Sequence, residues 1–168
     1  MMNWFKSAQN KVTKNELNKQ LKSLIKSHPF FIRLMAKYKI PQNEVDNIEF
    51  SVKDLGERHA EADATTITFN SNLFTEGDFF KDKLFYFVHE FYHWVRRRAE
   101  KQFYFNDPEE IESFALSIAW EIIGGKDRAT IEHSIFPIIQ GHFTDANQAK
   151  SLFSQMYEQA ESIAGLYT

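Results

Sequence analysis

Residues 84–95 read LFYFVHEFYHWV, an aromatic and aliphatic stretch in which two histidines stand four residues apart. In an α-helix, residues i and i+4 lie one above the other on the same face, so this spacing stacks His89 on His93. The apolar residues fall on the opposite side of the same helix; they are Leu84, Phe87, Val88, Phe91 and Val95. The pattern predicts one long helix over residues 78–101, with an apolar back and a polar histidine face that lines a cleft.

Two stacked imidazoles can chelate one zinc ion, and Glu90 lies beside them, where a water molecule would be held. A catalytic zinc site has three protein ligands and one open position, so another helix must supply the third ligand. We expect Glu112 to be that ligand, because it lies at the edge of the inward-facing apolar stripe of the helix predicted over residues 109–123. Glu110, which the periodicity places on the outer side, is the main alternative, and Glu109 is also near.

These residues resemble the gluzincin group of zincin metallopeptidases, which pair His-Glu-x-x-His with a downstream glutamate on a second helix. The matching residues are His89, Glu90, His93 and the run Asp107–Ala115. A strand predicted over residues 65–69 also corresponds to the substrate-binding edge strand of those proteins. The resemblance covers about residues 60–123. The short intracellular zincins of bacteria and phages are closest in size.

The resemblance implies a zinc-dependent peptidase that binds a peptide or protein substrate as an added strand along the sheet edge. Zinc would polarise the scissile carbonyl and bring the pKa of a water molecule towards ~7. Glu90 would take the proton as general base and later pass it to the leaving amine. His133, His142 and Tyr104 are candidates for the donor that stabilises the oxyanion.

The composition is that of a globular protein of one domain: 168 residues, of which 43% are hydrophobic and 26% charged. A net charge of −3 gives no reason to expect nucleic acid or an anionic membrane as partner. Cysteine is absent, which excludes disulfides and thiolate zinc sites. No segment reaches the ~18 apolar residues of a membrane span, and no secretion signal is visible. We therefore expect a soluble cytoplasmic protein, whose oligomeric state the sequence leaves open.

The remaining patterns predict a single α+β domain over residues 1–168, a helix-dominated zincin-like fold with a small antiparallel sheet and extra helices at both ends. The core would span about residues 45–125, with flanking helices over 13–40 and 127–165. A capping box from Thr13 to Glu16 begins the first helix, and Pro29 separates it from a second. Alternating segments at 48–52 and 65–69 predict two strands. Helices over 127–140, interrupted at Pro137, and over 144–164 complete the chain.

The motif has interpretations other than an active peptidase. A chance match on an aromatic core helix gives the histidines no function. A di-iron site needs a second Glu-x-x-His pair, which the sequence lacks. A structural zinc site needs a fourth ligand and gives Glu90 no task. A zincin-like binding protein without turnover is the remaining alternative to an active peptidase. The basic run at residues 96–98 is expected to be a solvated helix end.

Overall fold

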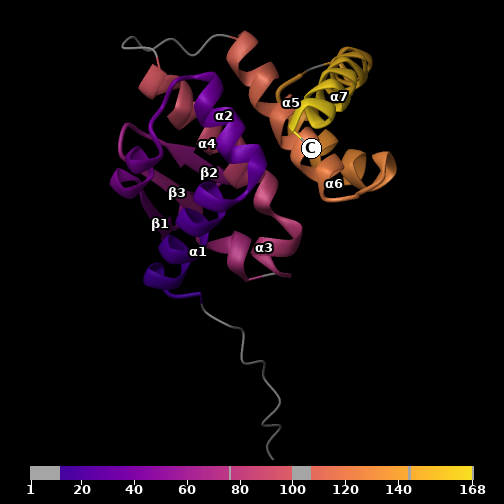
Figure 1. Cartoon of the computed structure of the whole chain (residues 1–168). Coiled ribbons are helices and arrows are strands. Elements are labelled where there is room, and N and C mark those ends of the chain that lie inside the picture. The colour runs from indigo at the N-terminus through magenta and orange to yellow at the C-terminus, as the bar shows by residue number, and fades with distance from the viewer. Residues whose placement is uncertain (1–11, 76, 100–106, 144, 168) are drawn as a thin grey trace, which may run out of the picture.

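A computed structural model describes residues 12–75, 77–99, 107–143 and 145–167 (Figure 1). Its elements follow in order as α1 (Lys14–Ser27), α2 (Pro29–Lys37), η1 (Gln42–Asn47), β1 (Glu49–Lys53), β2 (Ala60–Ala62), β3 (Thr66–Asn70), η2 (Ser71–Phe74), α3 (Phe79–Asp82), α4 (Leu84–Ala99), α5 (Asp107–Ile123), α6 (Arg128–Gln140) and α7 (Ala146–Tyr167). The helix-dominated α+β class predicted from the sequence is confirmed. Helix α4 connects a half made of α1, α2 and the sheet to the helices α5–α7.

The first two helices begin and end where the local signals predict. The hydroxyl of Thr13 accepts a hydrogen bond from the Glu16 amide, and the Glu16 carboxylate accepts one from the Thr13 amide at 3.0 Å, which completes the capping box. His28 ends α1 and caps α2, because its Nδ1 accepts a hydrogen bond from the Phe30 amide. Pro29 occupies the first turn of α2, where a missing N–H costs nothing.

The sheet has three strands in the order β1-β3-β2, and the prediction that it is antiparallel is wrong for its longer pair. Strands β1 and β3 run parallel, with Phe50 opposite Ile67, whereas β2 runs antiparallel to β3. The cause is a turn in which the Asp63 side chain accepts hydrogen bonds from the Thr65 and Thr66 amides. This turn pairs the short strand β2 with β3, so β1 joins the other edge of β3.

The helix that carries the histidines begins later than predicted. Asp78 caps α3 by accepting hydrogen bonds from the amides of residues 80 and 81, but the chain leaves helical geometry at Lys83 before α4 begins. The five apolar residues predicted for the back of α4 are all buried, as expected. The end predicted near Lys101 lies outside the described residues.

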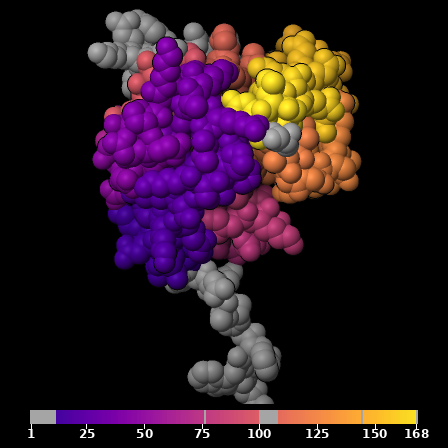
Figure 2. All heavy atoms as spheres, in the orientation of Figure 1, coloured from indigo at the N-terminus to yellow at the C-terminus, as the bar shows by residue number. Residues whose placement is uncertain are grey.

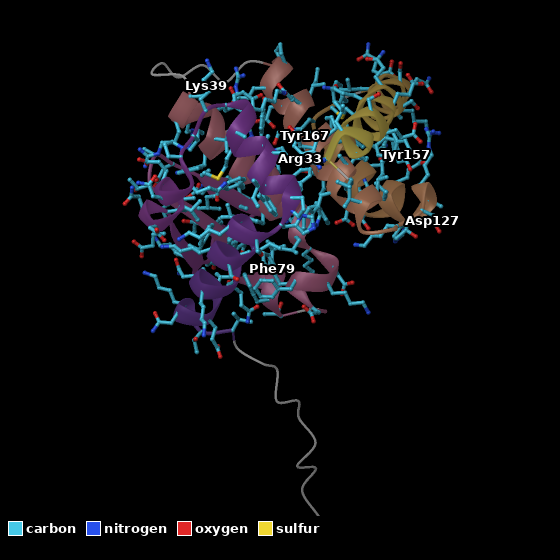
Figure 3. All side chains as sticks on the ribbon, viewed as in Figure 1. Arg33, Lys39, Phe79, Asp127, Tyr157 and Tyr167 are labelled. Atoms are coloured by element: carbon cyan, nitrogen blue, oxygen red, sulfur yellow. The ribbon has the colours of Figure 1, made fainter. Side chains whose placement is uncertain are left out.

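The C-terminal helices pack against the N-terminal ones. Helix α5 ends at Gly124 and Gly125, where Gly125 has a φ of +80°. Helix α6 continues through Pro137, where an interruption was predicted, and α7 returns towards α2. The Arg33 guanidinium donates a hydrogen bond to the Leu166 carbonyl at 2.6 Å, and Tyr167 lies close by (Figure 3).

The buried residues form one hydrophobic cluster rich in aromatic rings. The Phe31 ring of α2 contacts the rings of Phe87 and Phe91 on α4 and of Trp120 on α5, with centroids 5.2–5.4 Å apart. The surface in Figure 2 shows α2 and the C-terminal helices in direct contact. None of the helices in the described segments is long and apolar enough to cross a membrane.

Candidate metal centre

Two serines hold α4 and α5 close together. The Ser113 hydroxyl donates to the His89 carbonyl at 3.0 Å, and the Ser117 hydroxyl donates to the Phe85 carbonyl at 3.1 Å. Both serines are buried. Their small side chains let the helix backbones approach, and the hydrogen bonds satisfy hydroxyls that would otherwise be costly to bury. This face of α5 continues towards its N-terminus to Glu110, which therefore lies over the histidines.

The two histidines and Glu110 direct their donor atoms at one point. Nε2 of His89 lies 3.2 Å from Nε2 of His93, and the two carboxylate oxygens of Glu110 lie 3.3 Å and 3.1 Å from these nitrogens. Ligand atoms about 2.0–2.2 Å from a tetrahedral zinc ion stand roughly 3.3–3.6 Å apart. The observed separations are close to that spacing. Two imidazole nitrogens and one carboxylate also form the donor set of a catalytic zinc site, so these residues fit the metal.

A second carboxylate orients His93. Nδ1 of His93 lies 3.0 Å from Oε1 of Glu109, and both side chains are largely buried. When Nδ1–H donates to this carboxylate, the lone pair of Nε2 is left facing Glu110 and His89, which is the tautomer that a metal requires. Nδ1 of His89 is buried without a hydrogen-bond partner among the described residues. Glu109 thus contacts a candidate ligand from behind, whereas the sequence had offered it only as an alternative ligand.

The charges of the cluster favour metal binding. Burial raises the pKa of Glu110, but the hydrogen bonds from His89 and His93 outweigh it and hold this pKa well below the usual range. Burial lowers the pKa of His93, whereas the hydrogen bonds to Glu110 and Glu109 raise it, with a net increase. Glu110 is thus an ionised carboxylate at neutral pH. A cation at this position would replace the proton that His93 otherwise holds.

Glu112, the predicted third ligand, is not part of this cluster. Its carboxylate accepts hydrogen bonds from the Tyr38 hydroxyl at 3.1 Å and the Lys37 ammonium at 3.2 Å. Side chains two positions apart on a helix point about 200° apart, so only one of Glu110 and Glu112 can face the histidines. The placement of Glu110 on the outer side was wrong, because the face of α5 that meets α4 carries Ser113 and Ser117. The prediction had assigned the apolar stripe of α5 to that contact.

A cleft of about 680 Å³ opens beside the cluster, with Glu90, His89 and Glu110 in its wall. Burial raises the pKa of Glu90, the neighbouring histidines lower it, and burial prevails. Other parts of the wall come from residues 57–60, which lead into and begin β2, and from residues 137, 138, 141 and 142 at the end of α6. Glu90 thus lines the same cleft as His89 and Glu110, two of the three candidate ligands.

The residues that line the cleft bear on two further predictions, the substrate-binding strand and the oxyanion donors. The strand over residues 65–69, expected to be the edge strand for substrate, is the central strand β3, and β2 lies at the cleft instead. Of the proposed oxyanion donors, His142 lines the cleft and His133 does not. Tyr104 lies outside the described residues.

Comparisons with protein-family models, with curated proteins and with solved structures found no match.

The Glu109 contact leads to a direct prediction. Replacing Glu109 with Gln removes the negative charge behind His93, and we expect zinc affinity to fall about 10- to 100-fold. Competition titration with a zinc chelator would measure this change. Glu158→Gln, an equivalent change on the exposed side of α7, is the control and should leave the affinity unchanged. Equal affinities of the two variants would mean that Glu109 does not support the site.

Proposed function

We propose that this chain is a zinc-dependent peptidase whose metal ligands are His89, His93 and Glu110. The observation that carries the proposal is the convergence of two imidazole nitrogens and a carboxylate, with Glu90 in the wall of the cleft that His89 and Glu110 also line. Three protein ligands leave a fourth position open, as catalytic zinc sites require and structural sites do not. When bound, zinc would polarise a carbonyl group and make a water molecule more acidic.

Glu90 is suited to move the proton in this reaction. It follows His89 directly on α4, and both residues line the cleft. Its pKa is raised by burial, which brings the carboxyl nearer to the pKa of an efficient general base at neutral pH. Glu90 would accept a proton from the attacking water and donate it to the leaving amine. A binding protein without turnover would have no use for a carboxylate buried at this cost.

The edge strand β2 offers backbone groups to an extended peptide. Hydrogen bonds from the Asp63 amide to Thr66 and from the Asn70 amide to His59 show that odd-numbered residues of this strand face β3. In an antiparallel pair the intervening residues face away, so Ala60 directs its N–H and C=O to the outer edge. A peptide added there as a strand would run past the histidines, since residues 57–60 and His89 share the cleft.

Metal removal tests this function. Zinc-loaded protein is expected to cleave members of a mixed peptide library. A chelator should abolish cleavage, and one equivalent of zinc should restore it. Cleavage products would be identified by mass spectrometry, which also separates endopeptidase from exopeptidase action. Cleavage that persists in chelator would contradict the proposal. Zinc-loaded protein that cleaves no peptide would instead support a binding protein.

A further inference from the structure

The backbone that leads into β2 is already hydrogen-bonded just before the cleft residue Ala60. Arg58 stands two residues earlier, where the next residue of an added strand would pair. Its N–H donates to the Leu55 carbonyl at 3.3 Å, and its carbonyl accepts a hydrogen bond from the Asn70 side-chain amide at 2.7 Å. Asn70 itself is buried. An added strand therefore finds no backbone partner at Arg58.

Arg97 occupies the outer edge of β2 on the other side of Ala60. Ala62, two residues further along the strand, directs its carbonyl outwards as Ala60 does, and this carbonyl accepts a hydrogen bond from the Arg97 guanidinium. Arg97 follows His93 by one turn of α4, on the face that carries the histidines. The run at residues 96–98 was expected to be solvated, but Arg97 is half-buried. The helix of the metal ligands thus also closes the edge of the strand.

Nearby carboxylates hold the guanidinium of Arg97 in this position. Burial lowers the pKa of Arg97, and the charges of Glu90, Glu109 and Asp63 offset part of this effect. Because the usual pKa of a guanidinium is above 12, Arg97 stays charged. A hydrogen bond from a charged donor is stronger than one from a neutral amide. The amide of an incoming peptide is therefore a poor competitor for the Ala62 carbonyl.

We propose that Arg97 restricts a peptide substrate to one pair of backbone hydrogen bonds, both made with Ala60. This inference rests on the proposed peptidase function and on the binding of substrate as an added strand. A longer partner strand would need the backbone groups of Arg58 and Ala62, which are engaged. Substrate residues beyond the one that pairs with Ala60 therefore gain no backbone hydrogen bonds from β2. The substrates are short extended segments, recognised through a single residue of the strand.

An N-methyl scan of a peptide hydroxamate tests this restriction. The hydroxamate binds zinc, and each peptide amide is methylated in turn so that it can no longer donate a hydrogen bond. With zinc-loaded wild-type protein, isothermal titration calorimetry should find one sensitive amide, the partner of the Ala60 carbonyl. Its methylation should weaken binding about 10- to 100-fold. Methylation of the amides two residues to either side should change the affinity less than about threefold.

Two arginine variants locate the cause of the restriction. Arg97→Met removes the donor and frees the Ala62 carbonyl, so a second amide, two residues from the first, should become sensitive by about 10-fold. Arg98→Met, the same change at the next position, is the control and should keep the single sensitive amide. Arg98 is exposed and contacts Glu44 and Trp94. Both variants should bind zinc within a few-fold of the wild type.

The outcomes separate the two proposals. Two or more alternating sensitive amides in the wild type, or none at all, would overturn the restriction and leave the metal site standing. An unchanged single sensitive amide in Arg97→Met, or an equal loss of affinity for every methylated peptide, would exclude Arg97 as its cause. Hydroxamates that bind no more tightly with zinc than without would contradict the metal site itself, and the inference would fall with it.

Discussion

Glu90→Gln is expected to lower the rate of peptide cleavage by about 10²- to 10⁴-fold, which is the usual contribution of a general base. Gln has nearly the same size as Glu but cannot accept the proton. Because Glu90 is not among the three ligands, the variant should still bind one zinc ion per chain. Steady-state kinetics on a cleaved peptide, with metal analysis of the same sample, would measure both quantities.

The stability of this variant distinguishes catalysis from a structural role. A carboxyl group whose pKa is raised in the folded protein costs stability at pH values above its unfolded pKa. Since burial raises the pKa of Glu90, replacing it with neutral Gln should leave the melting temperature at pH 7 unchanged or increase it. Glu158→Gln, an exposed change on α7 outside the cleft, is the control and should keep near-normal activity. A Glu90→Gln protein that cleaves at the normal rate would exclude Glu90 as the base.

Glu110→Ala should weaken zinc binding by about 100-fold or more, since it removes a ligand rather than a supporting group. Glu112→Ala, two positions along the same helix, should leave zinc affinity within a few-fold of wild type. It should instead lower the free energy of unfolding of the zinc-free protein by about 1–3 kcal/mol, because the Tyr38 hydroxyl and the Lys37 ammonium lose their acceptor.

Zinc competition titration and chemical denaturation, applied to both variants, would measure these two effects. The pair is matched in residue type, helix and charge change, so a general electrostatic effect would act on both alike. Zinc loss in Glu112→Ala with retention in Glu110→Ala would restore Glu112 as the ligand and contradict the arrangement of α5 described above.

Local signals were sufficient for most helix ends and for the two histidines. The Thr13 capping box, Pro29 and the paired glycines after α5 each act within a few residues, so their effects could be predicted from the sequence. The stacking of His89 on His93 depends only on helical periodicity. The apolar back of α4 is likewise predicted by its spacing, and these residues are buried.

The errors concern contacts between elements distant in the sequence. Helix α5 packs against both α4 and α7. The face of α5 that contacts α4 therefore determines which of its glutamates lies over the histidines. The apolar stripe of α5 predicted Glu112, whereas the contact through Ser113 and Ser117 places Glu110 over the histidines. The sequence signal for this contact was a pair of small residues, Ser113 and Ser117, which lie four positions apart and begin one turn after Glu110. Strand β1 runs parallel to β3 because β2 pairs with the other edge of β3. Strand β2 has only three residues, which is too few to show a recognisable alternation of apolar and polar side chains.

X-ray absorption spectroscopy at the zinc edge tests the central claim most directly, because it reports the atoms around the metal without requiring a substrate. For protein loaded with one equivalent of zinc, we predict about two imidazole nitrogens at 2.0–2.1 Å and further oxygens at 2.0–2.2 Å, one of them exchangeable with solvent. The imidazole signal should diminish in His93→Ala. A wild-type chain that binds no zinc, or a spectrum without imidazole scattering, would contradict the metal centre and the peptidase function built on it.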